Sequence, residues 1–298
     1  MTERLVWEHD GRDWPLRESS RFVQAGGLRW HVQQLGQGPV LLLLHGTGAS
    51  THSWRDFAPL MARHFTVVAP DLPGHAFSDA APATQMSLPG MSAAIASLID
   101  ALGLDVALCI GHSAGAAIAA RMVLDATFKP DALVSINGAF LPLGGLPGLL
   151  FPPVARLMAA TPLASRLFAW RASERTAVER LIGGTGSALD ATGVDLYARL
   201  VRDARHAAGA LAMMAQWDLR PLLRDLPALR TPLVLLAGAN DRAVPPEQAH
   251  RVHALLPRAV ALAPIVLQQM GHLAHEEQPA EVARIVMNAL ARFQRLPA

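Results

Sequence analysis

Short, continuous apolar runs recur along the chain, with helical spacing between them. The five runs after residue 39 are Val40–Leu44, Phe65–Ala69, Val106–Ile110, Leu133–Ile136 and Leu233–Ala237. Continuous apolar runs are typical of strands buried on both faces of a parallel sheet. Helical patterns lie near residues 52–62, 90–102, 114–126, 246–256 and 279–294. The alternation predicts an α/β fold in which helices cover both faces of a mostly parallel, doubly wound sheet.

Two alternating runs precede this region and predict a hairpin. Phe22–Ala25 and Leu28–Val32 flank Gly26-Gly27, whose backbone accepts the positive φ of a tight turn. We therefore expect an antiparallel N-terminal edge on the sheet.

The alternation stops between residues 140 and 217. A Pro/Gly-rich entry (141–153) leads into arginine-bearing helical segments and a glycine-rich loop at 183–187. We expect residues 1–139 and 218–298 to form the core and residues 140–217 to form an inserted helical cap. An excursion at this point leaves the carboxyl edge of the sheet, where α/β proteins bind ligands, so the cap is expected to determine specificity.

The composition of the insertion indicates the kind of ligand it would cover. Its apolar side chains favour a bulky, apolar ligand, although they could equally form the cap's own core; they include Leu141, Leu143, Leu146, Leu149, Leu150, Phe151, Leu157, Met158, Leu167, Phe168, Trp170, Met213, Met214 and Trp217. Its arginines could pair with substrate carboxylates or lie on a solvated face; they are Arg156, Arg166, Arg171, Arg175, Arg180, Arg199, Arg202 and Arg205.

Charge and composition exclude several classes of protein. The 298 residues are 51% hydrophobic and 17% charged, which indicates a folded chain. A net charge of +2, 5% aromatic residues and a single lysine, Lys129, argue against nucleic-acid binding. Cys109 is the only cysteine, so no internal disulfide can form, and a reducing compartment is expected. The charged N-terminal segment 1–21 does not resemble a signal peptide, so we expect a cytoplasmic protein.

Residues 132–155 carry no charge and are long enough to cross a bilayer. The window also contains four prolines and four glycines, which would leave backbone groups unpaired in lipid. We therefore expect a strand followed by a loop. Two alternatives stay open for the loop, a lid over a cavity and peripheral contact with a membrane surface.

A nucleophile motif follows one of the buried strands. Gly111-His112-Ser113-Ala114-Gly115 has the form G-x-S-x-G and lies where Val106–Ile110 ends and an alanine-rich helix begins. Small flanking residues permit the sharp strand-to-helix turn that raises a serine hydroxyl above the sheet edge. Ser113 is the candidate nucleophile.

A serine hydroxyl needs a base within hydrogen-bond reach and an acid that orients this base. In the α/β-hydrolase fold, where this motif occurs, the chain order is nucleophile, acid, histidine. Asp241 follows a late strand and is the candidate acid; the rival position after Leu133–Ile136 holds Asn137, which cannot carry the charge. His272 follows the apolar run Ile265–Leu267 and is the candidate base, favoured over His275, which opens a helical pattern.

Acyl transfer also needs donors aimed at the oxyanion. The amide of Ala114, directly after the nucleophile, is one candidate. The other is the amide of Thr47, in the loop His45–Gly48 after the first buried strand.

Other polar residues receive simpler interpretations. Asp71 is expected to organise a turn at the end of a strand. His250 and His253 are three residues apart on a predicted helix, but no third ligand accompanies them, so a solvated face is expected rather than a metal site. The sequence contains no P-loop motif, which excludes a P-loop ATPase.

These motifs together resemble the α/β-hydrolase superfamily over roughly residues 20–295 outside the insertion. The matching segments are His45–Gly48, Asp71–His75, Gly111–Gly115, Gly238–Asp241 with Val244-Pro245, and Gly271-His272. Ala76 departs from the pattern, because many relatives have a glycine there.

Longer segments resemble the magnesium-chelatase accessory proteins of bacteriochlorophyll biosynthesis in photosynthetic bacteria. They are His45–Pro59, Gly111–Met122, Gly183–Asp190, Met214–Pro227 and Gly271–Pro279. The resemblance implies a role in tetrapyrrole metabolism and leaves open whether the protein hydrolyses a substrate.

The leading hypothesis is a serine hydrolase that cleaves an ester-like bond in a bulky apolar substrate, with a tetrapyrrole as a candidate, and needs no cofactor. The alternative is a non-catalytic accessory or tetrapyrrole-binding protein that assists magnesium chelatase, whose subunits would be its partners. A third alternative is an interaction protein without a ligand.

Overall fold

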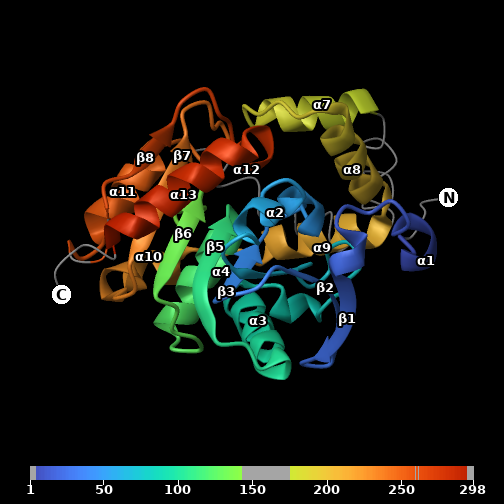
Figure 1. Cartoon of the computed structure of the whole chain (residues 1–298), viewed down its shortest axis with the longest axis horizontal. Helices are drawn as coiled ribbons and strands as arrows, with labels where there is room; N and C mark the ends of the chain where they lie inside the picture. Colours follow the sequence, from blue (N-terminus) through green and yellow to red (C-terminus); the bar gives the residue numbers. More distant parts are fainter. Residues whose placement is uncertain (1–4, 143–174, 259, 261, 294–298) are drawn as a thin grey trace.

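An eight-stranded sheet forms the centre of the molecule (Figure 1). The computed structural model describes residues 5–142, 175–258, 260 and 262–293. The strand order is β1-β2-β4-β3-β5-β6-β7-β8, with β1·β2 and β2·β4 antiparallel and all other pairs parallel. The strands are β1 (Ser20–Ala25), β2 (Leu28–Leu35), β3 (Val40–Leu44), β4 (Thr66–Pro70), β5 (Val106–His112), β6 (Ala132–Ile136), β7 (Leu233–Gly238) and β8 (Ile265–Leu267). The predicted fold class and its antiparallel N-terminal edge are confirmed.

The described residues form helices on both faces of this sheet and further helices outside it (Figure 1). They are α1 (Trp7–Asp10), α2 (Ala58–Met61), α3 (Leu88–Leu102), α4 (Ala114–Leu124), α7 (Arg175–Gly184), α8 (Ala191–Arg202), α9 (Ala204–Ala215), α10 (Arg220–Asp225), α11 (Glu247–Leu255), α12 (Ala274–Glu277) and α13 (Pro279–Phe293), with short 3-10 turns η1 (Arg17–Ser19), η2 (Thr51–Trp54), η3 (Ala83–Gln85) and η4 (Leu226–Ala228).

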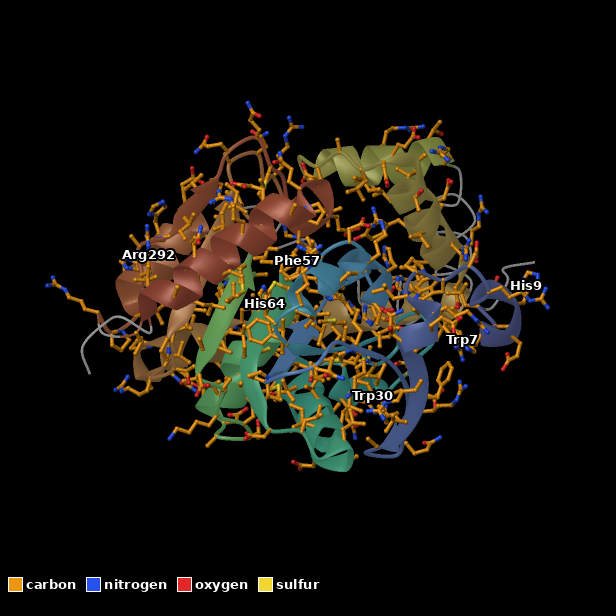
Figure 2. All side chains as sticks on the ribbon, viewed as in Figure 1. Trp7, His9, Trp30, Phe57, His64 and Arg292 are labelled. Atoms are coloured by element: carbon orange, nitrogen blue, oxygen red, sulfur yellow. The ribbon has the colours of Figure 1, made fainter. Side chains whose placement is uncertain are left out.

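Alternate residues of each central strand enter different cores. Leu42 and Leu44 of β3 pack into a cluster with α3, α4, α10 and α11, whereas Leu41 and Leu43 pack with α2 and α13. Both positions of the alternation are apolar because both faces of the sheet are covered. In Figure 2 the labelled side chains of Trp30 and Phe57, 1% and 0% exposed, lie within the body of the molecule.

The prediction of one continuous helix over 52–62 is wrong. The segment instead forms η2 and α2, separated by residues 55–57. Pro59 has no N–H to donate to the carbonyl of residue 55, and its ring would clash with that carbonyl, so one continuous helix cannot form.

Helices α7, α8 and α9 lie between β6 and α10. Leu196 and Leu200 of α8 pack with Trp14 and Phe77, and α7 and α8 together pack against Leu273. Most of the predicted Pro/Gly-rich entry lies outside the described residues, as do Leu143, Leu146, Leu149, Leu150, Phe151, Arg156, Leu157, Met158, Arg166, Leu167, Phe168, Trp170 and Arg171. The division into core and cap stays a prediction.

Within the described ranges, no helix has the length and apolar character needed to cross a membrane. The uncharged window begins with β6 and continues as irregular chain to residue 142.

Candidate active site

Ser113 lies at the sharp turn between β5 and α4. Its backbone has a positive φ (φ 51°, ψ −115°), which is rare for a residue with a side chain. A Cβ on Gly111 would lie 2.3 Å from the Ala116 nitrogen, and a Cβ on Gly115 would lie 2.1 Å from the Leu44 oxygen. The two glycines of the motif are therefore required by close backbone approach, and the half-buried Ser113 occupies a strained turn typical of a nucleophile elbow.

Asp241 and His272 contact each other directly. His272 Nδ1 lies 2.8 Å from Asp241 Oδ2, and the Asp241 side chain is fully buried. Asp241 Oδ1 accepts hydrogen bonds from the Ala243 and Val244 amides, both at 2.8 Å. Because a carboxylate only accepts hydrogen bonds, the proton on His272 is at Nδ1, which leaves Nε2 able to take a proton from a nucleophile.

His275, the competing base, is placed differently. Its Nε2 lies 3.2 Å from Ser53 Oγ, and its side chain is completely buried. Burial lowers the pKa of His275 to about 3, so the ring is neutral near pH 7. The hydrogen bond to Asp241 belongs to His272.

Asn137, to which the sequence assigned no role, connects the acid strand to the base loop. It follows β6 with φ 50°, a conformation that asparagine tolerates. Its Nδ2 donates to the carbonyls of Gly271 (2.9 Å) and His272 (2.7 Å). Its Oδ1 accepts from the Gly238 amide at 2.6 Å. A polar residue directly after a buried strand, beside the strand of the acid, is the sequence signal that could have found it.

His112 makes a second connection to the base. Its Nε2 donates to the His272 carbonyl at 2.9 Å, and the two imidazole rings are 4.7 Å apart. Burial lowers the pKa of His112 well below its usual range, so the ring is neutral. The main-chain carbonyl of His272 therefore has two side-chain donors, one of which adjoins Ser113 in the chain.

The loop after β3 forms a tight turn against the nucleophile. Ala49 N–H donates to the Gly46 carbonyl at 3.1 Å, and Gly48 has φ 78°. A Cβ on Gly46 would lie 3.0 Å from Ser113 Cβ, so the backbone of this turn touches Ser113. Thr47 is half-buried in the same turn, and Ala114 is the first residue of α4. Both candidate oxyanion donors thus belong to segments next to Ser113.

His45 holds the start of this turn. Its Nε2 accepts from the Leu72 amide at 2.9 Å, so its Nδ1 carries the proton and donates to the Gly46 carbonyl at 2.8 Å. Burial lowers the pKa of His45 to about 3, which keeps the ring neutral.

Asp71 makes buried structural contacts at the end of β4. Asp71 is buried, with Oδ2 2.7 Å from His31 Nδ1 and Oδ1 accepting from the Thr51 amide at 2.7 Å. Burial opposes its ionisation, but His31 lowers the pKa of Asp71 to about 2. In the part of the chain that the structure describes, no group of three or more His, Cys, Asp or Glu could hold a metal ion.

Comparison with known proteins places this geometry in a family. The sequence profile of the α/β hydrolase fold matches residues 39–279, so the chain belongs to that family. It is 40% identical over 266 residues to the "Magnesium-chelatase 30 kDa subunit" of Rhodobacter capsulatus, covering 89% of this chain and 92% of that protein.

Hydrolases are also among the relatives. The chain is 26% identical over 289 residues to 2-hydroxy-6-oxo-6-phenylhexa-2,4-dienoate hydrolase of Burkholderia cepacia, covering 92% of this chain and 96% of that protein. A solved epoxide hydrolase shares the fold with a TM-score of 0.77 at 21% identity, covering 92% and 98% of the two chains.

Proposed function

We propose that the protein is a serine hydrolase that cleaves an ester-like bond in a bulky apolar substrate. The main support is the 2.8 Å hydrogen bond between Asp241 and His272, beside a strained strand-to-helix turn that bears Ser113. A buried acid that orients a histidine ring next to such a turn is the arrangement that activates a serine hydroxyl.

The proposed reaction has two stages. Ser113 Oγ attacks the carbonyl carbon while His272 Nε2 takes its proton, and the amides of Thr47 and Ala114 stabilise the oxyanion. The intermediate collapses with release of the alcohol, which receives the proton from His272. Water then attacks the acyl-enzyme in the same manner and regenerates Ser113.

A tetrapyrrole ester of bacteriochlorophyll biosynthesis is the proposed substrate class. The support is the 40% identity to a protein named as a magnesium-chelatase subunit, together with the apolar composition of the insertion proposed as a cap. A flat macrocycle with an ester side chain would present apolar area to the cap and a carbonyl to Ser113.

A fluorophosphonate probe tests the nucleophile. We expect covalent labelling of the wild-type protein at Ser113, located by peptide mass spectrometry, and no labelling of Ser113→Ala. Folded wild-type protein that stays unlabelled would contradict the proposal.

One alternative function has its own support, namely a non-catalytic protein that binds a tetrapyrrole and assists magnesium chelatase. The name of the Rhodobacter capsulatus relative favours it. It predicts that Ser113→Ala keeps full porphyrin affinity and restores pigment synthesis in a mutant that lacks this protein. The hydrolase hypothesis predicts that Ser113→Ala binds porphyrin normally but does not restore pigment synthesis.

A further inference from the structure

One face of α9 packs against the turn that holds Thr47. His206, Gly209 and Met213 are spaced three and seven residues apart, so they lie on the same side of the helix over two turns. His206 contacts Gly48, and Met213 contacts Thr47. Between them, a Cβ on Gly209 would lie 2.1 Å from the Gly74 oxygen, so α9 lies in backbone contact with the core.

The hydrogen bonds of His206 have a defined direction. The Ala76 amide donates to His206 Nδ1 at 3.0 Å, so the proton of the neutral ring is on Nε2. Nε2 lies 3.1 Å from the Gly48 carbonyl and therefore donates to it. Burial lowers the pKa of His206 to about 4, which preserves this tautomer near pH 7.

No side chain packs against the α-carbon of Gly48. It has φ 78°, and a Cβ placed on it would meet nothing within 4 Å. Because glycine is conformationally permissive and no side chain packs here, two hydrogen bonds orient the peptide unit between Gly48 and Ala49: His206 Nε2 donates to the Gly48 carbonyl, and the Ala49 N–H donates to the Gly46 carbonyl. The Gly46 carbonyl shares a planar peptide unit with the Thr47 N–H, so the Ala49–Gly46 hydrogen bond couples the Gly48 carbonyl to the Thr47 N–H.

Ala76 supports the same contact from the other side. Its φ of 41° is unusual for alanine, and its amide is the donor to His206 Nδ1. The imidazole of His206 thus joins the Ala76 and Gly48 segments, which are far apart in the chain.

We propose that α9 positions the oxyanion donor, and that His206 is a positioning residue that aims the Thr47 amide at the reacting carbonyl by holding the carbonyl of Gly48. The inference rests on the proposed function, because it assigns Thr47 to the oxyanion hole. It gives the insertion a part in the chemistry in addition to its expected part in covering the substrate.

Two substitutions separate the two hydrogen bonds of His206. In His206→Gln, the side-chain Nε2 can still reach the Gly48 carbonyl, but no acceptor faces the Ala76 amide. In His206→Asn, Oδ1 can accept from Ala76, but no donor reaches Gly48. Each variant loses one buried hydrogen bond, so a purely structural role predicts similar effects of both on thermal unfolding and on labelling.

The rate constant for fluorophosphonate labelling of Ser113 is the first readout. We expect it to fall about 10- to 100-fold in His206→Asn and to stay within about threefold of wild type in His206→Gln, because misplacement of a catalytic donor slows the chemical step. Equal losses in the two variants would overturn the inference.

Hydrogen exchange of the amides of residues 47–49 is the second readout and needs no activity. We expect faster exchange in His206→Asn and unchanged exchange in His206→Gln. Unchanged exchange in both variants would overturn the inference. An unlabelled wild-type protein overturns the proposed function, and the exchange rates then still decide whether His206 holds the turn.

Discussion

The two halves of the candidate site are held in place by different parts of the chain. The proton-transfer half, Ser113, Asp241 and His272, lies on loops of the sheet and is joined by Asn137 and His112, which also follow or end central strands. In the oxyanion half, Ala114 lies at the start of α4, whereas the turn at Gly46–Ala49 that bears Thr47 is held by His45 and by contacts with α9.

This difference indicates how the two halves respond to change. The proton-transfer half is fixed by short contacts between neighbouring strand ends and by the loop at 185–187, where Ser187 Oγ accepts from the Leu273 amide at 2.8 Å and the Thr185 carbonyl accepts from the Arg242 amide at 3.0 Å. Substitutions in α9 should leave this half intact. The oxyanion half is exposed to changes in a helix that lies about 160 residues later in the chain. Substitutions in each half should therefore have separable effects.

The largest expected effect is in the proton-transfer half. In Asp241→Asn, the side-chain oxygen still accepts from Ala243 and Val244, which turns the amide nitrogen toward His272 Nδ1. His272 must then carry its proton on Nε2 and cannot accept one from Ser113, so we expect esterase kcat to fall about 10⁴-fold. Steady-state hydrolysis of a p-nitrophenyl ester measures it.

Thermal unfolding is the control for this variant. Because Asp241→Asn keeps the hydrogen bonds from the Ala243 and Val244 amides, its unfolding temperature should stay close to that of the wild type. A loss of activity below about tenfold would show that Asp241 does not orient the base.

Asn137→Asp tests the connection within the same half. The variant keeps the size and the acceptor for Gly238 but places a carboxylate against the carbonyls of Gly271 and His272. We expect the free energy of unfolding to fall by about 3 kcal/mol, because the new buried carboxylate would face two carbonyl oxygens and have no donor there. Urea unfolding at pH 7 measures it.

Asn240→Asp is the matched control, since Asn240 is exposed on the neighbouring loop and gains the same charge. If both variants lost equal stability, the added charge near Asp241 would be the cause, and Asn137 would not connect the two loops.

Much of the proton-transfer half could be predicted from the sequence. The position of Asn137 after a buried strand was a usable signal, whereas the contacts of α9 could not be predicted. Ser113, Asp241 and His272 follow buried apolar runs, and the pattern of these runs determines where parallel strands end. His206 lies in an alanine-rich helix with no motif, and its partners, Gly48 and Ala76, contribute only backbone atoms. Backbone acceptors and donors carry no sequence signal, and Ala76 was noted only as a departure from the family pattern.

The division of 52–62 into two elements was missed for a related reason. The apolar spacing there fits a helix, but a single residue, Pro59, removes the donor that the helix needs.

Acid should destabilise the fold around the oxyanion turn, where the ring of His75 packs between those of His45 and His206. Folding lowers the pKa of His45 and His75 to about 3 and of His206 to about 4, below the ordinary value of 6.5. The unfolded chain therefore binds more protons between pH 6.5 and about 4, so stability is complete above pH 6.5 and is lost as the pH falls through this window. Each histidine contributes up to about 1.4 kcal/mol per pH unit.

One group acts in the opposite direction. Burial raises the pKa of Glu276 to about 7, so this carboxyl favours folding at lower pH and offsets one histidine. Urea unfolding from pH 7 to pH 4.5 measures the net slope. His206→Gln should reduce the slope, and His250→Gln, at an exposed position of α11, should not. A slope that His206→Gln leaves unchanged would mean that His206 is not kept neutral by the fold.

The smallest expected effect is at the second contact of α9 with the oxyanion turn. The Thr47 hydroxyl donates to Met213 Sδ at 3.4 Å, and sulfur is a weak acceptor. Met213→Leu nearly preserves the volume of this fully buried side chain, so we expect a stability loss below about 1.5 kcal/mol. Labelling of Ser113 should slow only about two- to fivefold, because His206 still holds Gly48.

Met214→Leu, at the next and half-buried position of α9, is the matched control and should leave the labelling rate unchanged. Combining Met213→Leu with His206→Asn sharpens the test, since both side chains hold the same turn. If they act on one turn, the double variant should slow labelling by less than the product of the single effects. Independent, multiplicative losses would mean that Met213 and His206 act on the site by separate routes, and that α9 is not a single positioning element.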